Sequence, residues 1–110
     1  MMTFEDFRRL RLAANDCSSA QQLIDEDGGS VDCSDINLLI RQFAAIYSCK
    51  TAKDIRALTG LSQAKFSQEY GVSRRTIEDW DAGKRNPPAY VLDMMLFAVI
   101  SSDSFLDALQ

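Results

Sequence analysis

Residues 61–87 read LSQAKFSQEYGVSRRTIEDWDAGKRNP, and this stretch decides the fold. Apolar residues recur at helical spacing in two short segments, 62–70 and 73–82. Between them Gly71 can supply the positive φ that a tight turn between two helices requires. Ser73 is suited to cap the second segment, because its hydroxyl can accept a hydrogen bond from a free backbone N–H of the first turn. The stretch therefore predicts two short helices joined by a tight turn, a helix-turn-helix unit.

The second segment has one apolar side and one polar side. A helical projection at about 100° per residue places Trp80 beside Ile77, so both are expected to anchor the segment to a core. Arg75, Glu78 and Asp79 fall on the opposite side, and Arg74 falls on the flank. The polar side is thus predicted to be free to reach outward. Two arginines near a helix N-terminus, where the helix dipole is positive, suit a phosphate-rich surface.

The rest of the chain also has helical periodicity, with little of the alternation expected of strands. We expect further helices at about 3–14, 19–26, 34–47, 51–59 and 89–100. In the helix at 34–47 we expect Ser34 to be the cap and an apolar stripe to face the core, made of Ile36, Leu39, Ile40, Phe43, Ala44 and Tyr47. The predicted fold class is all-α, a compact helical domain.

Composition excludes several classes of protein. The chain has 110 residues, of which 46% are hydrophobic and 25% charged, as expected for one folded domain. No apolar run approaches the roughly 18 residues of a membrane span, and the N-terminal stretch has no apolar core typical of a secretory signal. A cytoplasmic protein without membrane association is the expectation.

The sequence favours neither catalysis nor metal binding. The chain has no histidine, and its three cysteines, Cys17, Cys33 and Cys49, form no C-x-x-C pair. The usual acid–base, Cys–His and phosphate-cradling signatures are also missing. We therefore expect no enzyme, no cofactor and no metal site, and we interpret the cysteines as small residues that fill helix junctions.

Charge is distributed unevenly along the chain, whose net charge is −4. Residues 51–86 hold seven Lys or Arg and five Asp or Glu, whereas residues 1–50 hold five and eight, and residues 87–110 hold three Asp and no base. Salt screens the electric field of such charges beyond about 8–10 Å under physiological conditions. The local excess of basic residues therefore matters more for binding a polyanion than the net charge of the whole chain. The middle segment is thus the candidate contact for nucleic acid.

The quoted stretch resembles the helix-turn-helix of the Xre family, the phage Cro/cI-like (lambda-repressor-like) class. The resemblance covers about residues 51–100 and rests on positions that match in register: Leu61, Ser62, Gln63, Gly71, Val72, Ser73, Ile77, Gly83, Lys84, Arg85 and Pro87. It implies a helix-turn-helix domain at 51–110 that binds double-stranded DNA as a homodimer. Residues 1–50 do not match and are predicted to be a helical extension that packs on this domain.

The resemblance also implies which residues touch DNA. Ser73, Arg74, Arg75 and Asp79 would face the major groove, with Thr76 and Glu78 at the flank. Gln63, Lys84, Arg85 and Asn86 would contact the phosphate backbone. The chemistry fits these roles, since arginine can pair with guanine O6 and N7, and a carboxylate can accept from cytosine N4. The implied function is a sequence-specific transcriptional regulator, either a repressor or an antitoxin-like protein with a cognate toxin or another protein as partner.

A structural role for the same residues is the competing interpretation. Arg74 and Arg75 can pair with Glu78 and Asp79 at i, i+4 on a solvated helix face, for about 0.2–0.5 kcal/mol each. Together with Asp81, these acids put three carboxylates on the helix that would enter DNA. They either impose selectivity or indicate an alternative function, a protein-interaction module that keeps the fold without binding DNA.

The apolar run near the C-terminus suggests a second interaction surface. Residues 94–97 read MMLF, and four consecutive side chains on a helix cannot all face one core. At least one of them should be exposed or lie in an interface with a second copy or another partner.

Overall fold

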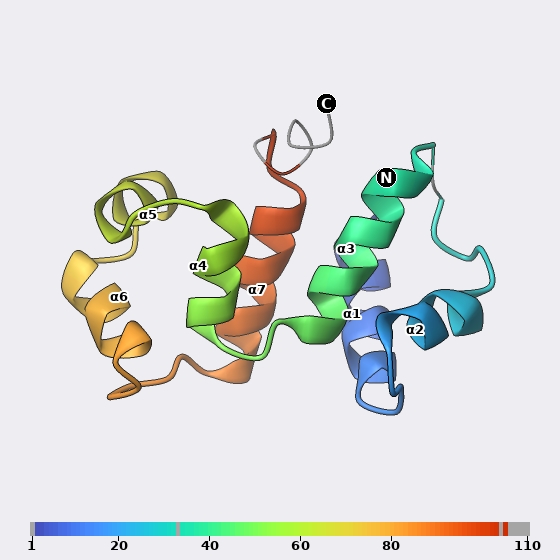
Figure 1. Cartoon of the computed structure of the whole chain (residues 1–110), viewed down its shortest axis with the longest axis horizontal. Coiled ribbons are helices and arrows are strands. Elements are labelled where there is room, and N and C mark those ends of the chain that lie inside the picture. Colours follow the sequence, from blue (N-terminus) through green and yellow to red (C-terminus); the bar gives the residue numbers. More distant parts are fainter. Residues whose placement is uncertain (1, 33, 104, 106–110) are drawn as a thin grey trace.

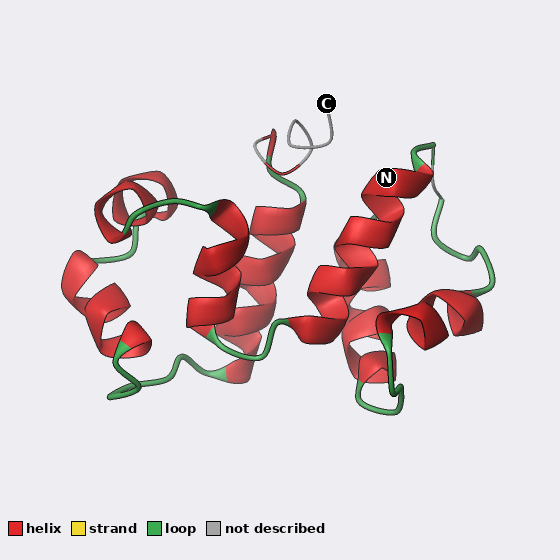
Figure 2. Ribbon diagram, viewed as in Figure 1, coloured by secondary structure: helices red, strands yellow, loops and turns green. Residues whose placement is uncertain are grey.

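The computed structural model describes residues 2–32, 34–103 and 105, and within them the protein consists of α-helices and loops, with no strand (Figure 2). The helices are α1 (Phe4–Ala14), α2 (Ala20–Asp27), α3 (Ile36–Ser48), α4 (Ala52–Thr59), α5 (Gln63–Tyr70), α6 (Arg74–Asp81) and α7 (Ala89–Ile100). The radius of gyration of the Cα atoms is 14.0 Å, close to the roughly 13 Å of a compact 100-residue domain. None of the described helices has the length and apolarity needed to cross a membrane.

Helix ends lie where short polar residues and glycines punctuate the sequence. Thr3 and Thr51 each close a capping box with the aspartate three residues later. Single side-chain caps come from Ser19, Ser62 and Ser73. At the other end, α2, α4 and α5 stop at glycines in the left-handed conformation.

The start of α3 differs from the prediction. Asp35, not Ser34, is the N-cap, and its Oδ1 accepts from the backbone N–H groups of Asn37 and Leu38 at 3.0 and 3.2 Å. A carboxylate can accept from two free N–H groups of the first turn and also carries the charge that the helix dipole favours. The neighbouring serine lacks this charge.

Helix α7 lies at the centre of the molecule (Figure 1). Helices α1 and α3 contact it on one side and α4 on the other, while α2 packs on α1 and α3. Helices α5 and α6 lie beyond α4, at the end opposite α2 (Figure 1). The buried side chains of the main core come from both sides of α7: Phe7, Leu10, Leu23, Phe43, Ile46, Ile55, Leu96, Val99 and Ile100.

Polar contacts tie α1 and α3 to α7. The guanidinium of Arg11 donates from Nε to Oδ1 of Asp93 at 2.9 Å, and from Nη1 to the carbonyls of Ile46 and Cys49 at 2.8 Å each. Arg11 therefore satisfies carbonyl groups at the C-terminal end of α3 and also pairs with the carboxylate that interrupts the apolar run of α7. One turn earlier on the same face of α3, the buried Gln42 donates to the carbonyl of Ile100 at 2.9 Å.

The predicted inward stripe of α3 is wrong in part. Ile36 is 62% exposed and Ile40 is 46% exposed, whereas the buried residues are Gln42, Phe43, Ala45 and Ile46. Most positions of this helix are apolar or small, so the spacing of apolar residues in the sequence did not decide which face points to the core. The partners α1, α2 and α7 bury the face that carries Phe43, Ala45 and Ile46, and Gln42 fits on this face because its amide donates to the carbonyl at the end of α7.

Helices from residues 1–50 pack on α7, as α4 does. Residues from both 1–50 and 51–110 belong to one core cluster. The division into an extension and a domain at 51–110 stays a prediction. Of the four apolar residues at 94–97, Met94 is 57% exposed and Leu96 is fully buried, as the expectation of at least one exposed residue requires.

The orientation of α3 can be tested with a pair of isoleucines. Ile46→Ala removes a fully buried side chain and should lower the free energy of unfolding by about 2–5 kcal/mol. Ile40→Ala, on the face that the sequence favoured, should lower it by less than about 1 kcal/mol. Urea unfolding followed by circular dichroism measures both, and equal losses would contradict this orientation.

Candidate nucleic-acid interface

Helices α5 and α6 are joined by residues Gly71, Val72 and Ser73. Gly71 has φ 71°, in the left-handed region, and its N–H donates to the carbonyl of Ser67 at 3.0 Å. A Cβ at Gly71 would have no atom within 4 Å, so the backbone conformation and not lack of space requires glycine here. The turn that the sequence predicted at Gly71 is confirmed.

One face of α6 anchors it to the protein. Ile77 is fully buried, and so is Phe66 of the neighbouring α5, whose ring lies 4.6 Å from that of Tyr70 between centroids. The inward orientation of Ile77 is therefore confirmed. Trp80 is only half-buried, so its predicted role as a second core anchor holds in part. Phe66 and Ile77 thus lie outside the main core cluster, whereas Tyr70 packs against that cluster and links α5 to it.

A polar junction formed by Arg56, Gln63 and Asp81 fixes α6 against α4 and α5. Arg56 Nη2 donates to Asp81 Oδ2 at 2.6 Å, and Gln63 Nε2 donates to the same oxygen at 2.9 Å. Arg56 Nη1 also donates to the carbonyl of Leu61 at 3.1 Å. The side chains of Arg56 and Asp81 are 22% and 15% exposed, so water screens this pair only partly. Three helices are thus joined through one carboxylate.

Asp81 ionises more readily because of this junction. Burial of the carboxyl raises the pKa of Asp81, but the hydrogen bonds from Gln63 and Arg56 and the charge of Arg56 outweigh it, so the pKa lies below its ordinary value. Asp81 is therefore a structural carboxylate. The outer face of α6 keeps two of the three acids that the sequence places on this helix.

Sequence reasoning missed Arg56. A basic residue in the last turn of α4 usually interacts with the helix dipole in solvent, and nothing in the sequence pairs it with a carboxylate 25 residues away. Gln63, expected to touch a phosphate, is half-buried and has its amide group directed to Asp81.

The outer face of α6 carries the predicted basic residues. Arg74 Nε lies 3.5 Å from Glu78 Oε1, and both side chains are more than half exposed. Asp79 does not pair with Arg75; its Oδ2 lies 3.9 Å from Arg85 Nη1 in the loop that follows. Arg75 is exposed, and within the described part of the chain its side chain has no hydrogen-bond or ion-pair partner. It is available to an external acceptor.

The remaining predicted contacts flank α6. At its start the hydroxyls of Ser73 and Thr76 lie 2.7 Å apart, and Ser73 Oγ accepts from the N–H of Thr76 at 3.1 Å. After its end, Lys84, Arg85 and Asn86 form an exposed loop. The backbone carbonyl of Asp79 accepts from the N–H groups of Lys84 and Arg85 at 2.9 and 3.4 Å, which holds this loop against the helix.

The amino-terminal half of the protein leaves α6 uncovered. Helices α1, α2 and α3 lie on the far side of α7 from α6, and the helices that contact α6 with several residue pairs are α4 and α5 (Figure 1). The structure thus brings Arg74, Arg75, Glu78, Lys84 and Arg85 together on one end of the molecule.

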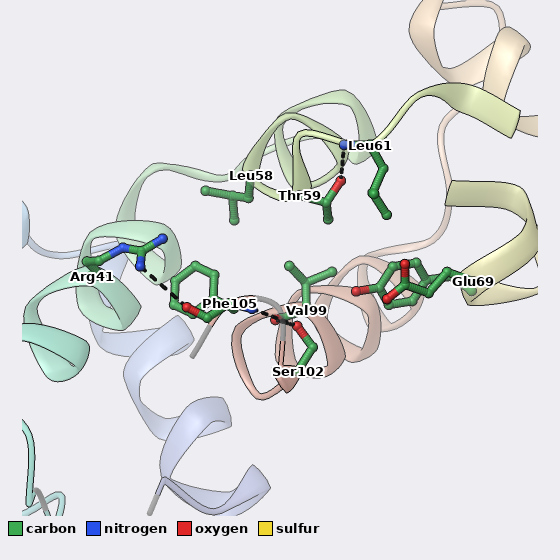
Figure 3. Close-up of a pocket in the computed structure, with 9 residues that line it drawn as sticks. Arg41, Leu58, Thr59, Leu61, Glu69, Val99, Ser102 and Phe105 are labelled. Atoms are coloured by element: carbon green, nitrogen blue, oxygen red, sulfur yellow. Dashed lines mark hydrogen bonds between the residues drawn. The ribbon is translucent and has the colours of Figure 1, made fainter. Parts of the chain in front are cut away.

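A small cavity lies between α3, α4, α5 and α7, away from this surface (Figure 3). Its volume is about 70 Å³, and several polar groups along it are used by the fold. Arg41 lies 4.4 Å above the ring of Phe105, Thr59 Oγ1 accepts from the N–H of Leu61, and Ser102 Oγ accepts from the N–H of Phe105 (Figure 3). It is a gap in packing and a poor candidate for a ligand site.

Comparison of the chain with protein-family models, with curated protein sequences and with solved structures finds no match.

The junction at Asp81 can be tested by its pH dependence. Because the pKa of Asp81 is lower in the folded protein than in the unfolded chain, ionised Asp81 stabilises the fold above about pH 4. That stabilisation is lost as the pH falls through the folded value. Asp81→Asn should lower the free energy of unfolding at pH 7 by about 1–3 kcal/mol, and the difference from wild type should shrink at lower pH.

Glu78→Gln is the matched control for this substitution. It removes a carboxylate from the same helix, but the pair with Arg74 is exposed, so a change below about 0.5 kcal/mol is expected. Chemical unfolding at pH 7 and at pH 3 compares the two variants. An Asp81→Asn effect that is no larger than that of Glu78→Gln would show that the junction does not hold α6.

Proposed function

We propose that the protein is a sequence-specific DNA-binding transcriptional regulator that inserts α6 into the major groove. Helices α5 and α6 with the Gly71 turn would form a helix-turn-helix of the Xre type, as the resemblance of residues 61–87 implies. The observation that carries the proposal is the exposed guanidinium of Arg75, which has no partner among the described residues, on a helix anchored from behind by Ile77.

Arg75 is the residue proposed to read a base. Arginine in the first turns of a recognition helix can donate two hydrogen bonds to O6 and N7 of guanine. No carboxylate of α6 has to be displaced first, because Asp79 is oriented toward Arg85 and Asp81 toward Arg56. The side chain of Arg75 can therefore approach the edge of a base without breaking an ion pair with a carboxylate of α6.

The acids on the outer face would add selectivity. Glu78 and Asp79 would repel phosphates where the helix is not seated in a matching groove, and each can accept from N4 of cytosine when it is seated. Arg74 lies close to Glu78, so the pair presents both a donor and an acceptor at the edge of α6. Ser73 and Thr76 would contribute hydroxyls at the helix start.

The loop after α6 would hold the DNA backbone. Lys84, Arg85 and Asn86 are exposed beside the helix, and the backbone N–H groups of Lys84 and Arg85 are held by the carbonyl of Asp79. Contacts from such residues position a protein on the duplex without specifying sequence. Gln63 would reach a phosphate only by changing partners, because its amide group is bonded to Asp81.

A homodimer bound to two half-sites about one helical turn apart would supply the remaining affinity. One α6 carries few cations, and its outer face has nearly balanced charge. Phosphate neutralisation dominates affinity for DNA, so two copies would be needed for tight binding. A cognate toxin or another protein remains part of the proposal as a partner of this regulator.

Binding to DNA can be tested with two substitutions that have different expected signatures. Sites selected from random duplex DNA serve as the probe. Arg75→Ala should weaken binding to the selected site by about 1–3 kcal/mol and relax preference at one base pair. Lys84→Ala should weaken binding to all DNA sequences alike. It should also reduce the slope of the logarithm of the binding constant against the logarithm of the salt concentration by about 1.

Arg8→Ala is the matched control, since Arg8 is an exposed arginine on α1, a helix that lies across α7 from α6 (Figure 1). It should leave site preference unchanged. If no site is enriched, or if Arg75→Ala and Arg8→Ala behave alike, the docking of α6 is wrong. Retention of a protein partner without any binding to duplex DNA at low salt would support the alternative, an interaction module with this fold.

A further inference from the structure

Exposed apolar side chains gather along the seam between α1 and α7. Of the six large hydrophobic residues that are exposed in the described chain, four lie here: Phe4 and Leu12 on α1, and Tyr90 and Met94 on α7. Leu12, Tyr90 and Met94 are 69%, 67% and 57% exposed. Single exposed apolar residues are ordinary, but a contiguous group is typical of an interaction site.

The same seam is hollowed. One depression of about 420 Å³ is lined by Phe4, Arg8, Tyr90 and Met94, and a second of about 380 Å³ by Arg8, Leu12, Lys50 and Leu92. Arg8, Ala89 and Asp93 line both, so the two depressions form one groove. Phe4, Arg8 and Leu12 lie at i, i+4 and i+8, which gives the α1 wall a length of about 12 Å. That length fits two to three turns of a helix.

The free charge in this groove is positive. Its charged lining residues are Arg8, Arg11, Lys50 and Asp93. Asp93 already accepts from Arg11 at 2.9 Å, and that arginine is further committed to two carbonyls. Arg8 has no ion pair within the described residues, and the ammonium of Lys50 contacts only the ring of Tyr47, at 5.5 Å from its centroid. Two cations therefore remain without a carboxylate.

We propose that this α1–α7 groove binds an acidic amphipathic helix of another protein. Its apolar side chains would occupy the depressions between Phe4, Leu12, Tyr90 and Met94, in the manner of helix-in-groove recognition. Its carboxylates would pair with Arg8 and Lys50. The surface is distinct from α6, so the proposal does not rest on DNA binding.

Charge disfavours the simpler occupant, a second copy meeting the same surface about a two-fold axis. In such an isologous contact the groove faces itself, so it offers Arg8 and Lys50 no free carboxylate from its own lining, because Asp93 is already paired with Arg11. Duplex DNA is also disfavoured, because phosphates would lie against Leu12, Tyr90 and Met94 and leave their apolar surface without a partner.

The test uses the full chain and a displayed library of peptides about four helical turns long, with fixed apolar positions at i, i+4, i+7 and i+11 and all others random. Selected peptides should be rich in Asp and Glu beside the apolar stripe. Fluorescence anisotropy with one selected peptide should show about ten-fold weaker binding for Leu12→Asp and for Arg8→Glu. A peptide with the acids changed to lysine should bind Arg8→Glu better than wild type.

Ile40→Asp is the matched control, because Ile40 is exposed on a different helix, and it should bind the peptide like wild type. Circular dichroism verifies that each variant is folded. Selected peptides without carboxylates, or equal binding by Leu12→Asp and Ile40→Asp, would overturn the proposal. Sedimentation that shows a dimer lost in Leu12→Asp would assign the groove to a second copy. Loss of DNA retention in Leu12→Asp, with peptide binding unchanged, would assign it to nucleic acid.

Discussion

The fold depends on the burial of α7, a helix that is apolar on nearly all sides. Its sequence, AYVLDMMLFAVI, cannot be covered by a single neighbour, because successive side chains point around the whole helix. Helices α1 and α3 cover one side and α4 the other. The one carboxylate near its middle, Asp93, is kept at the surface and paired with Arg11. The first half of the chain is thus needed to complete the core that α4 alone would leave open.

This central position of α7 determines where the two candidate surfaces lie. With α1–α3 on one side, α5 and α6 attach beyond α4, where α4 and α5 are the described helices that contact α6 with several residue pairs (Figure 1). The same arrangement leaves the first half of α7 partly uncovered next to α1, and this is the groove of Phe4, Leu12, Tyr90 and Met94. One packing constraint therefore gives a polar surface at one end and an apolar groove elsewhere.

The junction of Arg56, Gln63 and Asp81 has a second consequence for α6. It pairs Asp81, which lies four residues after Ile77 on the inner face, and it orients a helix whose apolar contact is otherwise small, since Ile77 is its only fully buried residue. A short helix with one buried side chain would be marginal by itself. The partly buried ion pair thus sets which residues of α6 face outward, and with them the chemistry that the surface can offer to a partner.

The sequence by itself determined the helices and, apart from the N-cap of α3, most of their ends, because caps, glycines and prolines act on the few residues around them. The turn at Gly71, the cap at Ser73 and the bounds of α7 were predicted from local signals of this kind. Only the tertiary structure decided the inward face of α3, the pairing of Asp81 with Arg56 and the meeting of α1 with α7. Those features depend on contacts between residues 25 to 82 positions apart, and no local pattern encodes which of several apolar faces or carboxylates a distant helix will select.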